Sequence, residues 1–598
     1  MCGIAGKINF LTPPSRAAVE RMTARLFHRG PDNGAVIQCN PHVIVGHRRL
    51  SIIDLSSDAN QPMIDSTGRF TIVYNGEIYN YKELREELIR SGFTFKTSSD
   101  TEVVLNSYIH WGESCFVKFS GMFALAIWDE QQKELICGRD RFGKKPFYYT
   151  YIGNEFTFAS ELHALLEDER IRDTVTISIE ALNQYLALGY ILSPVTIFRE
   201  VHKLEPSTFF KVNEKGIFKQ TRFWDYTTCF EPCFEKTEQE YSSEIRNRLK
   251  SAVQYRLNAD VPVGVLLSGG IDSSAITCMA SEIHSQKLHS FSIGFDESSY
   301  DESTDARFTA DFAGTIHHDH KITAPDRKTL IDTAIRIYDE PFADTSAIPT
   351  YAVSKHASSL VKVVLSGDGA DEIFGGYITY NADLLRKKLA WTGALRKLPV
   401  LLSPLLPGTT RKRKLPLNFK IKQFVRGLPL DYKRAHYTWR EIFTEQERIT
   451  ILGDSAKEEI CDTDPFKIFE RHYSEVEELD MISQHLYVDV KTWLADDILV
   501  KVDRASMACS LEVRCPFLDN TLVEYVAGIP SHLKIKNGSN KYILKKALEG
   551  IVPERTRKKK KSGFGAPVST WLQTSTLEDQ YRKFIRYTGK LRGLPIKL

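Results

Sequence analysis

The chain has 598 residues, of which 42% are hydrophobic and 26% are charged, and its formal net charge at pH 7 is +3. At roughly 100–200 residues per domain, this length predicts two large domains or about three smaller ones in an ordinary globular enzyme. A charge so close to neutral gives no reason to expect a nucleic-acid partner or a membrane surface.

The first third of the chain is predicted to be rich in β-structure. Residues 71–74 and 122–128 combine β-branched, aromatic and other apolar side chains, which is typical of strands. Residues 133–137 follow the second of these strands after a short polar turn, and they predict a hairpin. Residues 81–91 predict a helix, because leucines recur on one face and a glycine follows.

Strands and helices alternate further along the chain. Residues 205–238 mix proline, charged and aromatic side chains without clear periodicity, so we place a linker at 211–237. A helix is expected to begin near Glu238. Alternation with continuous apolar strands predicts a parallel sheet covered on both faces. The later segments are expected to be strands at 261–267, 289–294 and 361–365, a helix at 273–284, and mostly helices in the last third.

Cysteine usage and the N-terminal segment bear on the cellular setting. The ten cysteines are scattered, with no pair of CxxC motifs to indicate a zinc site. We expect reduced thiols in a cytoplasmic enzyme. The segment MCGIAGKINF lacks the regions of a signal peptide, and no apolar stretch of about 18 residues predicts a membrane span.

Cys2 is the first residue with a distinctive chemical possibility. Removal of Met1 would expose an α-amino group, whose pKa is ordinarily about 7.7–8.0, so a useful fraction is neutral in the cell. A neutral amine beside its own thiol can act as the general base for attack by that thiol. By itself, however, a cysteine at position 2 is most simply incidental.

Three nearby segments change the interpretation of Cys2. They read HRGPD (28–32), HRRLSIID (47–54) and YNGE (74–77). Asn75 and Gly76 could donate hydrogen bonds to an oxyanion. The residues that could bind the charged groups of an amino acid are Arg49, Glu77 and Asp100. Each segment alone is explained as well by a turn, a solvated charge or a salt bridge.

Together these segments resemble the glutaminase domain of class II amidotransferases over about residues 2–200. MCGIxG, HRGPD, RLSIID and YNGEIYN occur in the expected order. The resemblance implies an α+β, N-terminal-nucleophile αββα sandwich, predicted at 2–210, in which Cys2 is the nucleophile and Asn75 and Gly76 form the oxyanion hole. The glutamine-binding residues that it implies are Arg49, Leu50, Ile53, Asn75, Gly76, Glu77 and Asp100.

A second motif, LSGGIDS (267–273), lies between a predicted strand and a predicted helix. Glycines let the backbone approach an anion closely, and a helix N-terminus favours negative charge. No GK[ST] follows, so the motif is not a Walker A loop. LSGG also occurs in ABC ATPases, but the IDSS that continues it favours an ATP-pyrophosphatase loop.

An acidic segment, VLSGDGADEIFGG (364–376), follows another predicted strand. Ligands of open parallel sheets bind beyond the carboxyl ends of the strands, and Mg²⁺ prefers carboxylates together with phosphate oxygens. A solvated acidic turn is the ordinary alternative. We predict that Asp272 and Asp371 bind the metal.

Two further segments, DRASMACSLEVRCPFLD (503–519) and KSGFGAP (561–567), resemble the asparagine synthetase family. With the LSGGIDS loop, this resemblance covers about residues 240–575, in an α/β ATP-pyrophosphatase domain predicted at 238–598. It implies catalytic roles for Asp368 and for Lys561, which would stabilise charge on the adenylate and pyrophosphate. The ATP-binding residues are predicted to be Leu267, Ser268, Gly269, Gly270, Asp272, Ser273, Ile293, Ser366 and Gly367.

The two resemblances imply one reaction. ATP and Mg²⁺ activate a carboxylate as its adenylate, and ammonia freed from glutamine attacks it, which requires an internal passage between the domains. Aspartate is the expected acceptor, but relatives best established as asparagine makers often carry Glu where this chain has Asp368. Another carboxylate, such as a sugar uronate, is therefore the alternative.

Two other readings are disfavoured by intact residues. An inactive relative acting as a binding protein would not need the Cys2, Asn75, Asp272, Asp371 and Lys561 set. A β-lactam-forming cyclase would not need the glutaminase residues. Relatives are often homodimers, but no interface can be read from the sequence.

Overall fold

The computed structural model describes residues 2–217, 220–231, 236–389, 417–453, 456–560, 563–571, 582, 583 and 585. Lys561 lies outside the described residues, so its predicted role stays a prediction. No helix within the described ranges is long and apolar enough to cross a membrane.

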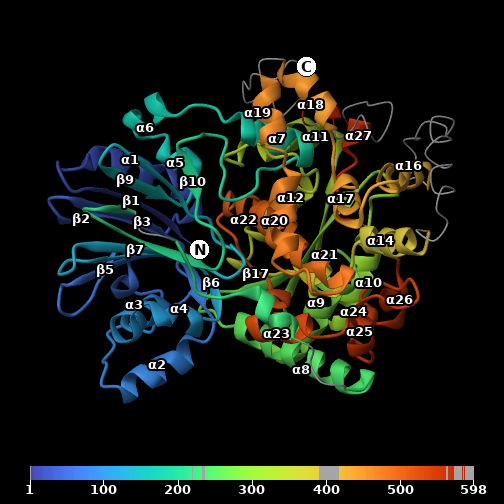
Figure 1. Ribbon diagram of the computed structural model, residues 1–598. Coiled ribbons are helices and arrows are strands. Elements are labelled where there is room, and N and C mark those ends of the chain that lie inside the picture. The colour runs from blue at the N-terminus through green and yellow to red at the C-terminus, as the bar shows by residue number, and fades with distance from the viewer. Residues whose placement is uncertain are drawn as a thin grey trace.

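Two antiparallel sheets pack face to face in the first third of the chain, on the blue side of Figure 1. One sheet contains β1 (Gly3–Asn9), β2 (Asn33–Asn40), β3 (Val43–Arg49), β8 (Tyr148–Ile152), β9 (Glu155–Ala159) and β10 (Val201–Lys203). The other contains β4 (Met63–Ile64), β5 (Phe70–Ile78), β6 (Gly121–Asp129), β7 (Glu134–Arg139), β11 (Thr208–Asn213), β12 (Gly216–Ile217) and β13 (Thr221–Arg222). Their orders are β10-β8-β9-β1-β3-β2 and β12-β11-β7-β6-β5-β4, with β13 beside β11.

Helices cover the outer face of each sheet. Helix α1 (Arg16–Arg25) packs on β1 and β3, and α3 (Asp100–Trp111) packs on β5 and on α2 (Tyr81–Arg90). Alternation along β5 explains the layers, because Val73 faces the core between the sheets while Ile72 and Tyr74 face the core beneath α2 and α3. The αββα sandwich and the β6–β7 hairpin are confirmed.

The segment predicted as a linker contains regular structure. β12 and β13 fall within residues 211–237 and pair with β11. Helix α8 (Glu238–Arg256) begins where predicted, because the Thr237 side chain and Glu240 form a capping box.

A parallel sheet organises the rest of the chain. Its order is β16-β15-β14-β17-β18. The strands are β14 (Val263–Leu266), β15 (His289–Phe295), β16 (Ile316–Ile322), β17 (Val363–Leu365) and β18 (Glu512–Arg514). The chain proceeds from β14 to one side of the sheet and returns to the other side at β17, so a topological switch point lies between β14 and β17. Ligands of such sheets bind beyond the carboxyl ends of the strands at this point.

Two helical layers sandwich this sheet. One layer has α8, α9 (Ile271–Ile283) and α10 (Ser303–Ala313). The other has α11 (Arg327–Arg336), α12 (Ala347–Ala357) and α22 (Leu499–Met507). The remaining helices include α14 (Ile378–Leu389), α16 (Leu417–Gly427), α17 (Tyr432–Thr438), α18 (Glu445–Leu452), α19 (Lys457–Asp462), α20 (Phe466–Ser474), α21 (Met481–Asp489), the π-helix η9 (Val490–Ile498), α23 (Asn520–Ala527), α24 (Ser531–Lys534), α25 (Tyr542–Ala547), α26 (Glu554–Lys558) and α27 (Val568–Trp571).

A buried histidine pair joins α14, α17 and α21. The His436 ring stacks on His485 with centroids 4.1 Å apart and planes 8° apart. His436 contacts Asp383 at 2.7 Å through Nδ1 and Asp489 at 3.2 Å through Nε2. Ligand atoms of Asp383, His436 and His485 lie within 4.8 Å of one another, but a metal in the plane of one ring would lie outside the plane of the other. The geometry therefore fits a shared-proton cluster better than a metal site.

This cluster predicts a pH-dependent stability. Burial alone would lower the pKa of His436, but Asp383 and Asp489 raise it to about 9. Because the folded-state pKa is raised, the stabilisation is complete below the unfolded value of about 6.5 and is lost as pH rises through about 9. In the unmodified protein the free energy of unfolding should fall by up to about 3 kcal/mol as pH rises through about 9. We expect this fall to disappear in His436→Gln and to persist in His110→Gln, a variant at an exposed site. An unchanged pH slope in His436→Gln would contradict the assignment.

The two domains are joined by buried charges. Asp503 of α22 binds Arg29 of the N-terminal domain at 2.9 and 3.0 Å and Lys145 at 3.4 Å. Arg29 also donates to the Cys2 carbonyl at 3.1 Å. The domain interface therefore holds the backbone of Cys2 directly.

Removing the Asp503 carboxylate should be costly. Asp503→Ala removes the ion-pair partner of the buried Lys145 and leaves Arg29 with Glu161 at 2.8 Å, and we expect a loss of about 3 kcal/mol in the free energy of unfolding. Lys362→Gln breaks another interdomain ion pair, with Asp32 at 2.8 Å, but that pair is partly exposed. The expected loss there is below about 1 kcal/mol. Denaturant titration of both variants checks the difference, and equal losses would contradict it.

Candidate active sites

The first site is built around Cys2, which is 7% exposed and directly precedes β1. Its backbone nitrogen donates to Asn75 Oδ1 at 3.0 Å. The Asn75 Nδ2 atom is buried and has no hydrogen-bond partner among the described residues. An amide donor held beside a thiol and left unpaired is suited to stabilise an oxyanion.

The environment of the thiol sets its protonation state. Burial raises the pKa of Cys2, while the Leu50 backbone N–H and the charge of Arg49 act in the opposite direction. The net rise keeps the thiol protonated at neutral pH, so attack on an amide requires a base. Gly76 is fixed nearby, because a Cβ there would lie 2.4 Å from the Met122 carbonyl oxygen on the neighbouring strand.

Two buried carboxylates, Glu77 and Asp100, complete this site. Asp100 accepts hydrogen bonds from the Tyr74 hydroxyl at 2.8 Å and from the Ile78 N–H at 3.0 Å. Burial raises the pKa of Asp100 to about 6 and also raises that of Glu77. Glu77 Oε1 is buried and lacks a hydrogen-bond donor among the described residues. The raised pKa values show that the surrounding donors do not fully offset burial, so a cationic ligand, such as an α-ammonium group, would stabilise both carboxylates.

Arg49 has a different immediate role from the one predicted for it. Its guanidinium donates to the Ser56 carbonyl and to Asn60 Oδ1, each at 2.8 Å, and to the Ile53 carbonyl at 3.3 Å. It also donates to the Asp54 carbonyl. Arg49 therefore holds the loop that follows β3 in place. Binding of glutamine by Arg49 and Ile53 stays a prediction.

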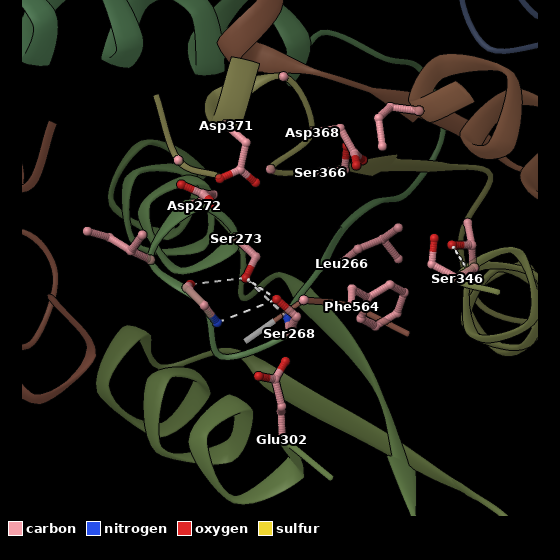
Figure 2. Close-up of a pocket in the computed structure, with 18 of the residues that line it drawn as sticks. Leu266, Ser268, Asp272, Ser273, Glu302, Ser346, Ser366, Asp368, Asp371 and Phe564 are labelled. Atoms are coloured by element: carbon pink, nitrogen blue, oxygen red, sulfur yellow. Dashed lines mark hydrogen bonds between the residues drawn. The ribbon is translucent and has the colours of Figure 1, made fainter. Parts of the chain in front are cut away.

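The second site is a cavity of about 380 Å³ at the switch point of the parallel sheet. Figure 2 shows its floor, where the loop after β14 meets the loop after β17. Ten of the predicted residues line it: Leu267, Ser268, Gly270, Asp272, Ser273, Ile293, Ser366, Gly367, Asp368 and Asp371. Gly269 does not line it. With φ +70, Gly269 instead packs against α10, where a Cβ would lie 2.7 Å from the Ala306 nitrogen.

The LSGGIDS loop is pre-shaped for an anion. Ser273 Oγ accepts from the Ser268 N–H at 3.1 Å and lies 3.0 Å from Ser268 Oγ (Figure 2). Helix α9 starts immediately after Gly270, so its N-terminus faces the cavity. A Cβ on Gly367 would lie 2.7 Å from the Ser273 nitrogen. The two loops thus approach too closely for a side chain at Gly367, and the glycines let their backbones lie close to a phosphate.

Lys541 is a site residue that the sequence analysis missed. Its Nζ lies 2.6 Å from Asp272 Oδ2 and 2.6 Å from Asp371 Oδ1, so both carboxylates converge on one point. Lys541 adopts φ +53, a strained conformation for a non-glycine residue. A Cβ on Gly376 would lie 2.3 Å from Lys541 Cε, which explains the glycine there. The only signal was the turn-rich sequence NGSNK at 537–541.

Another part of the cavity, away from Lys541, contains both a cation, Lys501, and carboxylates. Lys501 lies 3.2 Å from Asp344 Oδ2. Burial alone would lower the pKa of Lys501, but Asp344, Asp497 and Asp368 raise it overall. Asp368, beside Ser366 in Figure 2, makes no hydrogen bond or ion pair with another described residue. Its carboxylate is available to a ligand.

The geometry defines a class of enzyme. A buried cysteine at position 2 with an unpaired amide donor lies in one domain, and a cavity at the switch point of a parallel sheet, with two converging carboxylates, lies in the other. This pairing is that of a glutamine-dependent, ATP-using amidotransferase. The asparagine synthase family model matches residues 244–590, and the glutamine amidotransferase domain model matches residues 1–224. The chain belongs to the asparagine synthase family.

The chain is also similar to individual known proteins. The chain is 36% identical to the glutamine-hydrolysing asparagine synthetase 1 of Bacillus subtilis (strain 168), over 97% of this chain and 89% of that protein. It is 31% identical to amidase chry2 of Gibberella zeae, over 96% of this chain and 90% of that protein. A solved glutamine phosphoribosylpyrophosphate amidotransferase of B. subtilis is 15% identical, with TM-score 0.30, over 54% of this chain and 81% of that one.

Proposed function

We propose that the chain makes asparagine from aspartate, using glutamine as nitrogen donor and Mg·ATP as the activating agent. The observation that carries the choice of acceptor is the Asp368 carboxylate, which faces the cavity without a partner among the described residues. It can receive the α-ammonium group of aspartate, and Lys501 lies close enough to balance the acceptor's negative charge. The similarity to an asparagine synthetase over most of the chain supports the same choice.

The glutaminase half is proposed to work through Cys2. After removal of Met1, the α-amine takes the thiol proton, and the sulfur attacks the glutamine side-chain amide. Asn75 Nδ2 and the Gly76 N–H stabilise the oxyanion that forms. Glu77 and Asp100 bind the α-ammonium group of glutamine, and Leu50, Ile53 and Arg49 form the rest of the pocket. Ammonia then passes between the domains.

The synthetase half is proposed to hold ATP between the two loops at the switch point. The convergence of Asp272 and Asp371 on one point fits a hard divalent cation, and Mg²⁺ bound there would neutralise developing charge on the phosphates. Lys541 lies between the two carboxylates and would move toward the phosphates when they bind. Lys561 is predicted to assist charge stabilisation on the pyrophosphate.

A second acceptor class has two observations in its favour. The Asp368 side chain is one methylene shorter than the glutamate of many asparagine makers, which leaves room for a different acid, and one relative carries the name amidase. A uronate, however, brings no ammonium group for Asp368. Aspartate is therefore the first choice.

The acceptor is identified by supplying ammonium chloride, Mg·ATP and one candidate acid at a time. Formation of AMP, pyrophosphate and amide is followed. We expect product with aspartate at a kcat/KM at least about 100-fold above that with glutamate or galacturonate. Product with a uronate and none with aspartate would overturn the assignment of the acceptor but preserve the reaction type.

A further inference from the structure

Arg514 belongs to the ATP-binding domain, yet its side chain reaches the glutaminase site. Arg514 ends β18 and is fully buried. Its Nη2 lies 3.2 Å from Glu77 Oε2 across the domain interface. Its Nε donates to Glu512 at 2.6 Å, and its Nη1 donates to the Arg256 and Asn258 carbonyls at 2.9 and 2.6 Å. The guanidinium is thus rigidly anchored in its own domain while it contacts the other.

The backbone of the same residue touches the second active site. The Arg514 carbonyl accepts a hydrogen bond from the Ser366 N–H at 2.9 Å. Ser366 lines the nucleotide cavity. The next residue, Cys515, places Sγ 3.5 Å from Ser366 Oγ. One residue therefore bonds to a carboxylate of one site through its side chain and to the wall of the other through its main chain.

The contacts that begin at Arg514 extend through Ser366 and Gly367 to the LSGGIDS loop. Gly367 packs so closely on Asp272 and Ser273 that a Cβ would meet the Ser273 nitrogen at 2.7 Å. A nucleotide that orders Ser366 and Gly367 would therefore also fix the carbonyl of Arg514. Backbone so tightly packed transmits a shift instead of absorbing it.

The pKa of Glu77 depends on the charge of Arg514. Burial, Asp100 and Glu512 each raise the pKa of Glu77, and Arg514 is the neighbour that opposes them most. Holding the guanidinium at Glu77 limits the rise in its pKa and so favours the ionised carboxylate, which can pair with an ammonium group. Loosening it favours the protonated acid, which binds a cation poorly.

We propose that Arg514 is a positioning residue that couples the two active sites, so that nucleotide bound at Ser366 strengthens glutamine binding at Glu77. The inference rests on the proposed binding of glutamine by Glu77. Coupling of this kind is reciprocal, so glutamine strengthens nucleotide binding by the same factor.

The test measures the KM for glutamine in the hydrolysis reaction, with and without saturating Mg·ATP and with no acceptor present. We expect Mg·ATP to lower this KM by about 5-fold or more in the unmodified protein. In Arg514→Gln the KM values for glutamine without and with Mg·ATP should differ by no more than about 2-fold, so that their ratio is close to one. Arg514→Lys keeps the charge, so Mg·ATP should still lower the KM for glutamine in this variant, but by less than in the unmodified protein. Arg514→Lys also replaces Arg514→Gln in the test if Arg514→Gln fails to fold.

Lys362→Gln is the matched control. Lys362 precedes the neighbouring strand β17 and also makes an interdomain ion pair, but with Asp32 and not with Glu77. It should keep the full ratio. The proposal is overturned if Arg514→Gln keeps the original ratio, if Mg·ATP has no effect on the unmodified protein, or if Lys362→Gln loses the ratio equally. Failure of the acceptor assay would instead count against the proposed function, because the ratio needs only glutamine hydrolysis and nucleotide binding.

Discussion

Replacing Cys2 by alanine should lower glutamine hydrolysis and glutamine-dependent amide formation by about 1000-fold or more, while leaving the reaction with ammonium salts within about 2-fold. The reason is that the variant removes only the sulfur that attacks glutamine. The nucleotide cavity is formed by residues of the other domain. The three rates are measured on one preparation by following glutamate, AMP and amide product.

Cys39→Ala is the matched control for this experiment. Cys39 lies on β2, away from Asn75 and Glu77, and its thiol is only partly buried. All three rates should survive in this variant. Loss of the ammonia-dependent reaction in a folded Cys2→Ala protein would show that the two half-reactions are not divided between the domains as described.

Replacing Asp272 or Asp371 should have the opposite effect to Cys2→Ala: the synthetase reaction is lost and glutamine hydrolysis is kept. Asp272→Asn and Asp371→Asn each remove one of the two charges that meet at Lys541. We expect AMP and pyrophosphate formation to fall by about 100-fold or more, because the charge that would hold Mg²⁺ against the phosphates is halved. Glutamine hydrolysis in the absence of ATP should persist.

The control for the aspartate variants is Asp311→Asn, at an exposed position on α10 in the same domain. It should keep the rate of AMP formation. If Asp272→Asn and Asp371→Asn also formed AMP at the original rate over a range of magnesium concentrations, these residues could not be the metal ligands.

Much of the fold follows from local patterns. Runs of apolar, β-branched and aromatic residues predicted β5, β6, β7, β14, β15 and β17 within a few residues, because each strand buries at least one face. β18 was missed, since two of its three residues, Glu512 and Arg514, are charged. Their burial is offset by an ion pair between them and by the contacts of Arg514 with Glu77 and two backbone carbonyls. Such a strand cannot be recognised from hydrophobicity.

Some of the site residues could likewise be predicted from local motifs, and others could not. Motifs pointed to Cys2, Asn75, Glu77 and Asp100, and the structure buries all four and joins Cys2 to Asn75 by a hydrogen bond. Lys541 could not be found from its neighbours, because its importance depends on two aspartates from loops far away in the sequence. Contacts between distant segments are set by the packed tertiary structure, which local propensity does not encode.

The central claim is that the two sites catalyse one continuous reaction. It is tested most directly by supplying glutamine labelled with ¹⁵N in its amide, Mg·ATP and aspartate in the presence of excess unlabelled ammonium. If ammonia passes internally, the asparagine formed will carry far more ¹⁵N than the bulk ammonium pool, and one AMP will appear for each amide. Asparagine labelled only to the level of the bulk pool would contradict the account.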